Sequence, residues 1–268
     1  MSIPESGAGA LVIIPTYDER ENLPIIVRKV FDAVPEANIL VMDDGSPDGT
    51  GELADEMAAL DARLTVIHRS GKLGLGSAYL AGFAEGIARG YDYLVELDAD
   101  GSHPPEKLPE MLGVISSDPS IGLVIGSRWT AGGRVVDWPK RREALSRSAN
   151  AYAGFMLGIG VKDSTGGYRV YRASLIDSLD LSEVNSKGYC FQIDMTLRTL
   201  DAGARVVEVP ITFKDREFGE SKMSGSIIVE AMRNVTVWGI QRHAPGAKAK
   251  REAAAAASPW SLRLHAEE

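Results

Sequence analysis

The stretch YLVELDADGSHPPEKL, residues 93–108, runs from an apolar strand directly into two carboxylates. Asp98 and Asp100 follow the apolar run at the point where a buried strand is expected to end. Carboxylates beside an apolar core are costly unless a positive partner or hydrogen bonds compensate them. The stretch therefore marks the end of a core strand, and its two acids need a metal ion, a lysine or water as their partner.

Similar apolar runs alternate with helical patterns through the first half of the chain. The strand-like runs cover residues 10–14, 38–43, 64–69, 91–98 and 121–127, and the helical patterns cover 22–34, 48–60, 76–88 and 105–116. Continuous apolar strands that alternate with helices are typical of a parallel sheet covered on both faces. We therefore predict an α/β fold with a mainly parallel central sheet, in which ligands bind at the carboxyl ends of the strands.

The second half of the chain is less regular. Its patterns predict helices over 141–157, 191–203 and 224–242 and strands over 167–172 and 204–214. Residues 243–268 are rich in Ala and Lys and lack a sustained apolar face, so we expect a flexible C-terminal tail. Residues 1–9 are expected to form a flexible N-terminus, which leaves a single domain over 10–242.

Composition and charge narrow the class of protein. The chain has 268 residues, 44% of them hydrophobic, as in an ordinary globular protein, and its net charge of −8 argues against nucleic-acid binding. The single cysteine, Cys190, suits a reducing compartment and is expected to be a core thiol. We expect no signal peptide, and the longest nearly apolar run, 153–161, is far below the ~20 residues of a membrane span. The expected protein is soluble or peripheral to a membrane.

A basic segment interrupts this acidic chain. Between residues 128 and 147 only Asp137 and Glu143 oppose the basic residues Arg128, Arg134, Lys140, Arg141, Arg142 and Arg147. On charge alone the segment is equally well explained by a local anionic ligand and by a solvated helix face.

The two acids of the opening stretch favour a divalent cation. Carboxylates this close repel each other, and a hard cation relieves that repulsion while leaving coordination sites for phosphate oxygens. The alternative is a capped, solvated loop, but the acids at other strand ends favour the metal. Zinc is disfavoured because no Cys/His cluster accompanies the acids.

Two further strand ends carry polar loops with two interpretations each. In VMDDGSPDGT, residues 41–50, Asp43 or Asp44 accepts hydrogen bonds from a base or ribose, or the segment is only a turn with Asp48 capping a helix. The loop GLGSAY, residues 74–79, lacks the dinucleotide fingerprint because Tyr79 stands at the third glycine position. Gly74 and Gly76 therefore make either a tight helix entry close to a ligand or a plain turn.

The ordered motifs resemble a known family. The segments are VIIPTYDERENL, VMDDGSPDGT, LGLGSAYLAGF, ELDADGSHPPE, IGSRWTAGG, DSTGGYRVYR, SKGYCFQIDM and EVPITFKDREFGESKM, in this order. Over residues 10–242 the chain resembles the inverting family two glycosyltransferases of the GT-A fold, specifically the polyprenol-phosphate (dolichol-phosphate) mannosyltransferases, and most closely their actinobacterial branch. The resemblance implies transfer of mannose from GDP-mannose to a polyprenyl phosphate.

The resemblance also implies the site residues. The residues implied to bind the nucleotide sugar are Pro15, Tyr17, Glu19, Asp43, Asp44, Asp98, Ala99, Asp100, Arg216 and Lys222. Those implied to bind the acceptor phosphate are Arg128, Arg142 and Ser146. The implied catalytic residues are Asp98, Asp100, Arg128 and Arg216. Mg²⁺ or Mn²⁺ is implied at Asp98, Asp100 and Ser102. Family members often carry glutamine at the position of Ser102, so water or His103 is expected to complete the coordination.

The chemistry of such a transfer suits these residue types. A departing diphosphate needs a cation and basic side chains, and an acceptor that is already a phosphate needs clamping more than deprotonation. Arg142 and Ser146 are spaced i, i+4 and share one helix face. Asp194 stands where relatives with hydroxyl acceptors keep a base, and here we expect an orienting or structural role.

Membrane contact and specificity stay open from sequence alone. The 224–242 helix, with Arg233 and Trp238, either rests on a membrane or membrane-anchored partner at the cytoplasmic face, or packs on the domain. The rival activities are glucose transfer from UDP-glucose to a polyprenyl phosphate and a non-catalytic nucleotide-sugar-binding scaffold.

Overall fold

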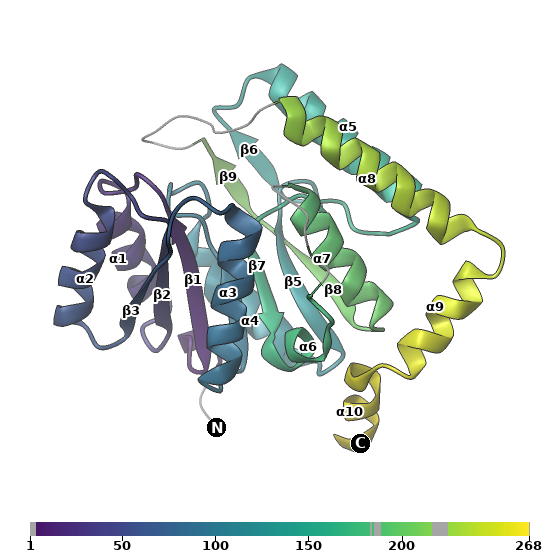
Figure 1. The fold of residues 1–268 in the computed structure, drawn as a ribbon, viewed down its shortest axis with the longest axis horizontal. Coiled ribbons are helices and arrows are strands. Elements are labelled where there is room, and N and C mark those ends of the chain that lie inside the picture. Colours follow the sequence, from purple (N-terminus) through teal and green to yellow (C-terminus); the bar gives the residue numbers. More distant parts are fainter. Residues whose placement is uncertain (1–3, 183, 185–188, 216–224, 268) are drawn as a thin grey trace.

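The computed structural model describes residues 4–182, 184, 189–215 and 225–267. Its main sheet has the strand order β3-β2-β1-β4-β7-β5-β8 (Figure 1). The strands are β1 (Ala10–Thr16), β2 (Asn38–Asp43), β3 (Leu64–His68), β4 (Tyr93–Glu96), β5 (Ile121–Ser127), β7 (Arg169–Arg172) and β8 (Arg205–Pro210). β7 runs antiparallel to β4 and β5, and the other pairs are parallel. The predicted mainly parallel sheet is confirmed.

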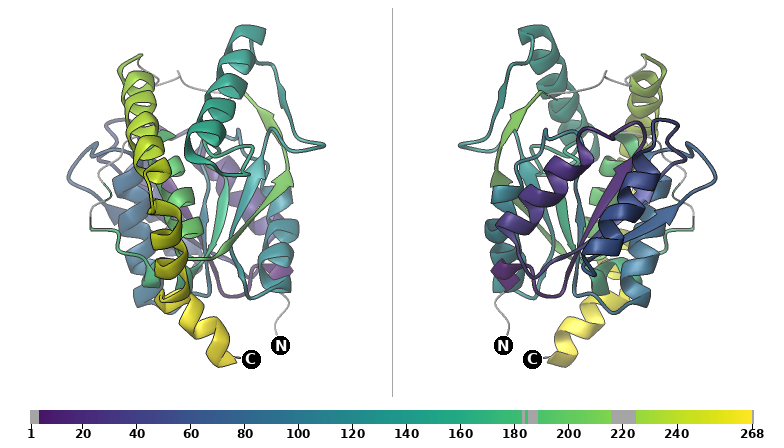
Figure 2. Two further views of the ribbon diagram at one scale, coloured as in Figure 1. Left: turned by 90° about the vertical axis from the view of Figure 1, so that its right-hand side faces the viewer. Right: turned by 90° about the vertical axis from the view of Figure 1, so that its left-hand side faces the viewer.

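Helices cover both faces of this sheet (Figures 1 and 2). One face packs against α1 (Leu23–Ala33), α2 (Thr50–Leu60) and α4 (Leu108–Ser117), and the other against α3 (Leu75–Ala88), α6 (Ala173–Ser178) and α7 (Tyr189–Asp201). Along β1, Val12 and Ile14 enter the first core, whereas Leu11 and Ile13 enter the second. Because both sides of each central strand are buried, the strands read as continuous apolar runs.

Two long helices stand beside the sheet rather than on it (Figure 1). They are α5 (Lys140–Leu157) and α8 (Gly225–His243), and a small parallel sheet of β6 (Arg134–Val136) and β9 (Thr212–Lys214) leads toward them. Tyr152 and Thr236 share a hydrogen bond of 2.6 Å between the helices, and a Cβ added at Gly239 would lie 2.6 Å from the Met156 carbonyl oxygen. The strand predicted over 204–214 is thus divided between two sheets. None of the described helices is both long and apolar enough to cross a membrane.

The chain ends differ from the expected flexible segments. The short 3-10 helix η1 (Pro4–Ser6) is tied to the domain, because the Ser6 carbonyl accepts a hydrogen bond of 2.9 Å from the Glu36 amide. The C-terminal segment forms α9 (Ala247–Ala256) and α10 (Pro259–Glu267). Trp260 is 2% exposed and packs with Leu175, Ala202 and Ala204.

The expectation of a flexible tail is therefore corrected. One large aromatic side chain docks the segment, although its sequence has no repeated apolar spacing. Polar contacts reinforce the docking, since Ser258 and Ser261 both donate to the Ala202 carbonyl and Arg242 pairs with Asp201 at 2.6 Å.

Removing the docking side chain tests this packing. We expect Trp260→Ala to lower the free energy of unfolding by about 3 kcal/mol, as for other buried aromatic truncations. Leu262→Ala is the matched control, because Leu262 lies on the same helix but is 59% exposed, and it is expected to change stability by less than ~0.5 kcal/mol. Urea unfolding followed by circular dichroism measures both, and equal losses would contradict the docked arrangement.

Candidate active site

The predicted nucleotide residues converge at the carboxyl edge of the sheet. Pro15 lies in β1, and the loops after β1 and β2 are joined because the Glu19 amide donates to Thr50 Oγ1 at 3.0 Å. Asn22 stands at the N-cap of α1, but its side-chain amide donates to Glu19 at 2.7 Å rather than capping the helix. The Lys72 ammonium lies 4.3 Å from the centre of the Tyr17 ring, which brings in the loop after β3.

Asp43 and Asp44 divide the two roles that their segment suggested. Asp43 builds the turn, since it accepts hydrogen bonds from the Gly45 amide and from the Ser46 amide and hydroxyl. Asp44 instead forms a largely buried ion pair with Arg69 at 2.7 Å. Burial raises the pKa of Asp44, and Arg69 opposes that shift. The turn interpretation thus fits Asp43, and contact of Asp43 or Asp44 with a nucleotide stays a prediction.

The acid pair of the opening stretch lies directly beyond β4. The Asp98 side chain is 34% exposed, and the Tyr79 hydroxyl donates to its Oδ1 at 3.3 Å. Asp100 accepts a hydrogen bond of 3.1 Å from the Ser102 amide. His103 is buried, and its Nδ1 lies 3.2 Å from the Asp98 backbone nitrogen.

A divalent cation fits the donors at this position. Ser102 Oγ is buried and finds no hydrogen-bond partner among the described residues, so an acceptor oxygen is left over beside the two acids. Hard cations prefer such oxygen ligands. The described residues contain no cluster of three His, Cys, Asp or Glu side chains suited to a metal. His103 does not fit as a ligand through Nδ1, because that nitrogen accepts the Asp98 amide proton.

A buried polar layer lies beneath the acids. Glu96, the last residue of β4, stands opposite Arg169 of β7 in the register and accepts a hydrogen bond of 2.7 Å from Gln192 Nε2. Burial raises the pKa of Glu96 to about 8, against the opposing effects of Arg169 and Gln192. Arg169 donates to the carbonyls of Ser164 and Gly166 at 2.8 and 2.7 Å. This layer fixes the loop over residues 163–167.

Arg128, expected at the acceptor phosphate, is buried in an ion pair. Its Nε and Nη2 bind the two oxygens of Asp163 at 2.8 and 2.7 Å, and Nη2 also donates to Thr165. Both ion-pair partners are buried, and Asn150 of α5 donates to Thr165 as well. Arg128 therefore anchors the 163–167 loop, and its direct contact with a phosphate stays a prediction.

An apolar groove of about 310 Å³ lies between α5 and α8. Arg142 and Ser146 line it together with Trp138, Leu145, Ser148, Ala149, Tyr152, Ala153, Thr165, Ile193, Ala231, Met232 and Val235. The Arg142 guanidinium lies 4.0 Å from the Trp138 ring centre and pairs with Asp215 at 3.0 Å. The basic segment thus supplies a polar wall to an apolar groove.

Loop 163–167 connects this groove with the acid pair. Thr165 lines the groove, and a Cβ added at Gly167 would lie 4.0 Å from Asp98 Oδ2. The structure therefore brings Asp98, Arg142 and Ser146 to one side of the molecule. Arg216 and Lys222 lie outside the described residues.

Three other sequence expectations have clear outcomes. Cys190 is a fully buried core thiol, as expected. Gly76 is needed for helix packing rather than for a ligand, because an added Cβ would lie 2.8 Å from the Phe191 ring. Asp194 accepts a hydrogen bond of 2.9 Å from Arg198 one turn later on α7, which fits the expected structural role.

The sequence did not identify Arg69, Asn150, Asp163 or Gln192. Asp163 stands in a motif that the resemblance did use, but its charge partner is 35 residues away. No local pattern signals such a contact.

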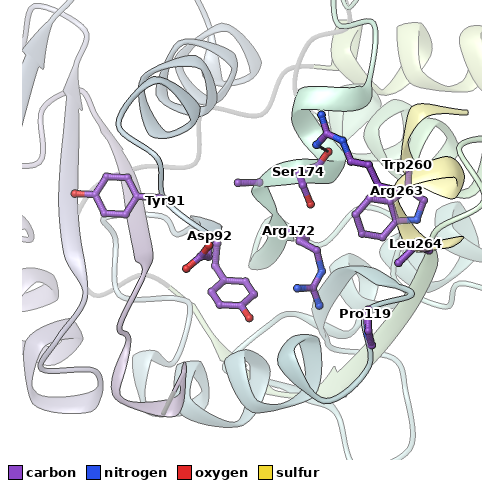
Figure 3. A pocket seen from close by; sticks show the side chains of 10 residues that line it. Tyr91, Asp92, Pro119, Arg172, Ser174, Trp260, Arg263 and Leu264 are labelled. Atoms are coloured by element: carbon purple, nitrogen blue, oxygen red, sulfur yellow. Dashed lines mark hydrogen bonds between the residues drawn. The ribbon is translucent and has the colours of Figure 1, made fainter. Parts of the chain in front are cut away.

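A second cavity, of about 320 Å³, lies at the opposite edge of the sheet (Figure 3). Tyr93, Arg172 and Ser174 line it together with Trp260 and Arg263 of α10. None of the predicted site residues that the structure describes lines this cavity, and the carboxyl edge is the candidate active site.

Comparison with known proteins agrees with this geometry. Residues 11–180 match the model of glycosyl transferase family 2. The chain belongs to this family. It is therefore a glycosyltransferase, and the resemblance seen in its sequence is confirmed.

Two curated relatives are similar over nearly their whole length. A polyprenol monophosphomannose synthase from Mycolicibacterium smegmatis is 56% identical over 256 residues, covering 90% of this chain and 96% of the relative. An undecaprenyl-phosphate mannosyltransferase from Micrococcus luteus is 53% identical over 240 residues, covering 90% of this chain and 98% of the relative.

A solved structure supports the GT-A fold. Glucosyl-3-phosphoglycerate synthase from Mycobacterium tuberculosis, in complex with Mn²⁺, UDP and glucosyl-3-phosphoglycerate, superimposes with a TM-score of 0.60. Its sequence is 21% identical, and the match covers 89% of this glycosyltransferase and 81% of the solved chain. At this identity the likeness concerns the fold alone.

The buried ion pair of this glycosyltransferase gives a direct test of the site's framework. We expect Asp163→Asn to lower the free energy of unfolding by roughly 3–5 kcal/mol, because it leaves the Arg128 charge buried without its partner. The matched control is Asp215→Asn, which breaks the half-exposed pair with Arg142 and is expected to cost about 1 kcal/mol or less. Urea denaturation compares the two variants, and similar losses would show that Asp163 does not anchor the loop.

Proposed function

We propose that this glycosyltransferase moves mannose from GDP-mannose to a polyprenyl phosphate. The observation that carries the proposal is the apolar groove between α5 and α8, with Arg142 and Ser146 in its wall and loop 163–167 leading to Asp98. The names of the two curated relatives support a mannosyl product on a polyprenyl phosphate carrier.

The acceptor matches the groove in both of its chemical parts. An isoprenoid tail gains free energy by leaving water for the apolar walls of Ala149, Ala231 and Val235. Its phosphate then lies at Arg142, whose planar guanidinium is suited to bidentate phosphate binding, and at the Ser146 hydroxyl. The Trp138 ring fixes the guanidinium from one side.

The donor belongs at the carboxyl edge of the sheet. Tyr17, Glu19 and Asp44 lie around the nucleotide position, and the acids Asp98 and Asp100 lie where its diphosphate would end. Asp98, Asp100 and Ser102 would hold Mg²⁺ or Mn²⁺, which neutralises the charge that develops on the departing diphosphate. Arg216 and Lys222 are proposed to add positive charge to that diphosphate.

The proposed reaction is a single displacement. A phosphate oxygen of the acceptor attacks C1 of the mannose, while the bond from C1 to the β-phosphate oxygen breaks and GDP leaves with its electron pair. The acceptor is already anionic, so no side chain has to remove a proton. Attack opposite the leaving group inverts C1 and gives a β-linked mannosyl phosphate.

The outer face of α5 and α8 is proposed to rest on the cytoplasmic face of a membrane. The two helices carry six of the eleven large hydrophobic side chains that are exposed among the described residues: Leu145 and Met232 also line the groove, whereas Phe155, Val229, Val237 and Ile240 do not. Arg233 is exposed on the same helix as the last three, whereas Trp238 packs against the cluster around Ala153. Apolar residues with adjacent cations suit an interfacial helix, with or without a membrane-anchored partner.

Transfer of labelled sugar tests the reaction. Incubation of the full chain with Mn²⁺, undecaprenyl phosphate and radiolabelled GDP-mannose is expected to give a labelled lipid whose anomeric NMR signals show a β linkage. Radiolabelled UDP-glucose in place of radiolabelled GDP-mannose is expected to give no labelled lipid. Preferential transfer of glucose would overturn the proposed donor, an α linkage would overturn inversion, and tight GDP-mannose binding without transfer would favour a scaffold.

Blocking the groove tests the acceptor site separately. We expect Ala149→Trp to fill the groove and raise the KM for undecaprenyl phosphate at least about tenfold, equivalent to ~1.4 kcal/mol of lost binding, with unchanged Kd for GDP-mannose. The matched control is Ala151→Trp, since Ala151 is exposed on the same helix but does not line the groove. Equal kinetic changes in the two variants would remove the groove from the acceptor site.

A further inference from the structure

The Asp98 carboxylate is held from two sides by side chains of different elements. Tyr79 donates to the carboxylate from α3, whereas His103, from the loop that follows the acid pair, accepts a hydrogen bond from the Asp98 backbone amide and lies beside the carboxylate. Both side chains are buried, whereas the Asp98 side chain is 34% exposed and faces the site. We propose that Tyr79 and His103 are positioning residues, which set the orientation of Asp98 for the cation and donor diphosphate of the proposed function.

Tyr79 acts through its hydroxyl. The hydroxyl donates to Asp98 Oδ1 at 3.3 Å, and the ring is stacked near Phe83 and Phe191, with centroid distances of 6.4 Å to each. An ordinary phenol is protonated at neutral pH and can donate this hydrogen bond. The aromatic stack limits movement of the ring away from the carboxylate.

His103 acts through both ring nitrogens. Nδ1 accepts the Asp98 backbone amide proton at 3.2 Å, so in the neutral ring the proton is on Nε2. Nε2 lies 3.9 Å from Asp98 Oδ2, so the ring also borders the second carboxylate oxygen. The ring stacks on Tyr168 at 5.2 Å and meets the edge of Phe213 at 5.5 Å, which fixes its plane.

These contacts assign each Asp98 oxygen to a different neighbour. Oδ1 faces the phenol and Oδ2 faces the imidazole, so rotation of the carboxylate would weaken both interactions. Both neighbours are neutral in this arrangement, so they orient the carboxylate without cancelling its charge. Groups that hold a metal ligand in this way typically change metal affinity by 10–100-fold when they are removed.

Cation binding measures this role without any acceptor or transfer step. The probe is Mn²⁺ titrated into the full chain with saturating GDP, and in parallel with UDP, with free Mn²⁺ measured by electron paramagnetic resonance. We expect Tyr79→Phe, which keeps the ring, to weaken Mn²⁺ binding about tenfold. Tyr93→Phe is the matched control, because Tyr93 is also buried but lies at the opposite end of β4 from the acid pair, and it is expected to leave Mn²⁺ affinity unchanged.

Two substitutions separate positioning from packing at His103. His103→Asn removes the ring but places an amide oxygen near the position of Nδ1, whereas His103→Phe keeps the ring and removes both nitrogens. If His103 acts by positioning Asp98, His103→Asn retains more Mn²⁺ affinity than His103→Phe. If it acts only by packing, the order is reversed. Urea unfolding of each variant ensures that the titrations compare folded proteins.

The outcomes distinguish this inference from the proposed function. Unchanged Mn²⁺ affinity in Tyr79→Phe, or greater affinity in His103→Phe than in His103→Asn, would overturn the positioning role even if mannose transfer is observed. Weakened affinity in the predicted order would support it even if the transferred sugar or the acceptor differs from the one proposed. If the unmodified chain bound no Mn²⁺ with either nucleotide, both the positioning role and the proposed cation site would be overturned.

Discussion

Arg128 and Asp163 meet almost out of contact with water, and their ion pair joins the two parts of the candidate active site. A buried charge without its partner costs several kcal/mol, so the two side chains hold each other in place. Asp163 begins the loop that passes the groove at Thr165 and reaches the Asp98 carboxylate at Gly167. Arg169 fixes the same loop from below through the carbonyls of Ser164 and Gly166. The distance between donor and acceptor positions therefore depends on this one loop.

The acids at the carboxyl edge differ in what surrounds them, and this difference assigns their roles. Asp43 is occupied by the amides and hydroxyl of its own turn, and Asp44 is paired with Arg69. Asp98 is oriented by a phenol and an imidazole, and Asp100 by a backbone amide. Similar carboxylates thus become a turn former, an ion-pair partner and the two proposed cation ligands. Glu96 lies buried below these acids. Burial raises its pKa to about 8 and so favours its protonated form.

The proposed sites show how one fold could serve a water-soluble donor and a lipid acceptor. The proposed donor position lies over the sheet, whose strands are covered on both faces and end in polar loops. The proposed acceptor groove lies between α5 and α8, which stand beside the sheet (Figures 1 and 2) and carry exposed apolar side chains. The helices α9 and α10 return from α8 to the base of the domain, where Trp260 docks them. The element that borders the groove is therefore held at its far end by the same domain that binds the donor.

The sequence by itself determined the alternation of strands and helices, the polar loops at the strand ends and the family. Periodicity and turn residues are local, so the predicted 141–157 helix and the strand runs of the first half agree closely with α5 and with β1–β5. Tertiary structure decided the partners of the charged residues. The pairing of Arg128 with Asp163, the contact of Tyr79 with Asp98 and the docking of Trp260 all join segments that are distant in sequence. The free energy of these contacts depends on burial and geometry, which exist only once the chain has folded. No local pattern of residues therefore predicts them.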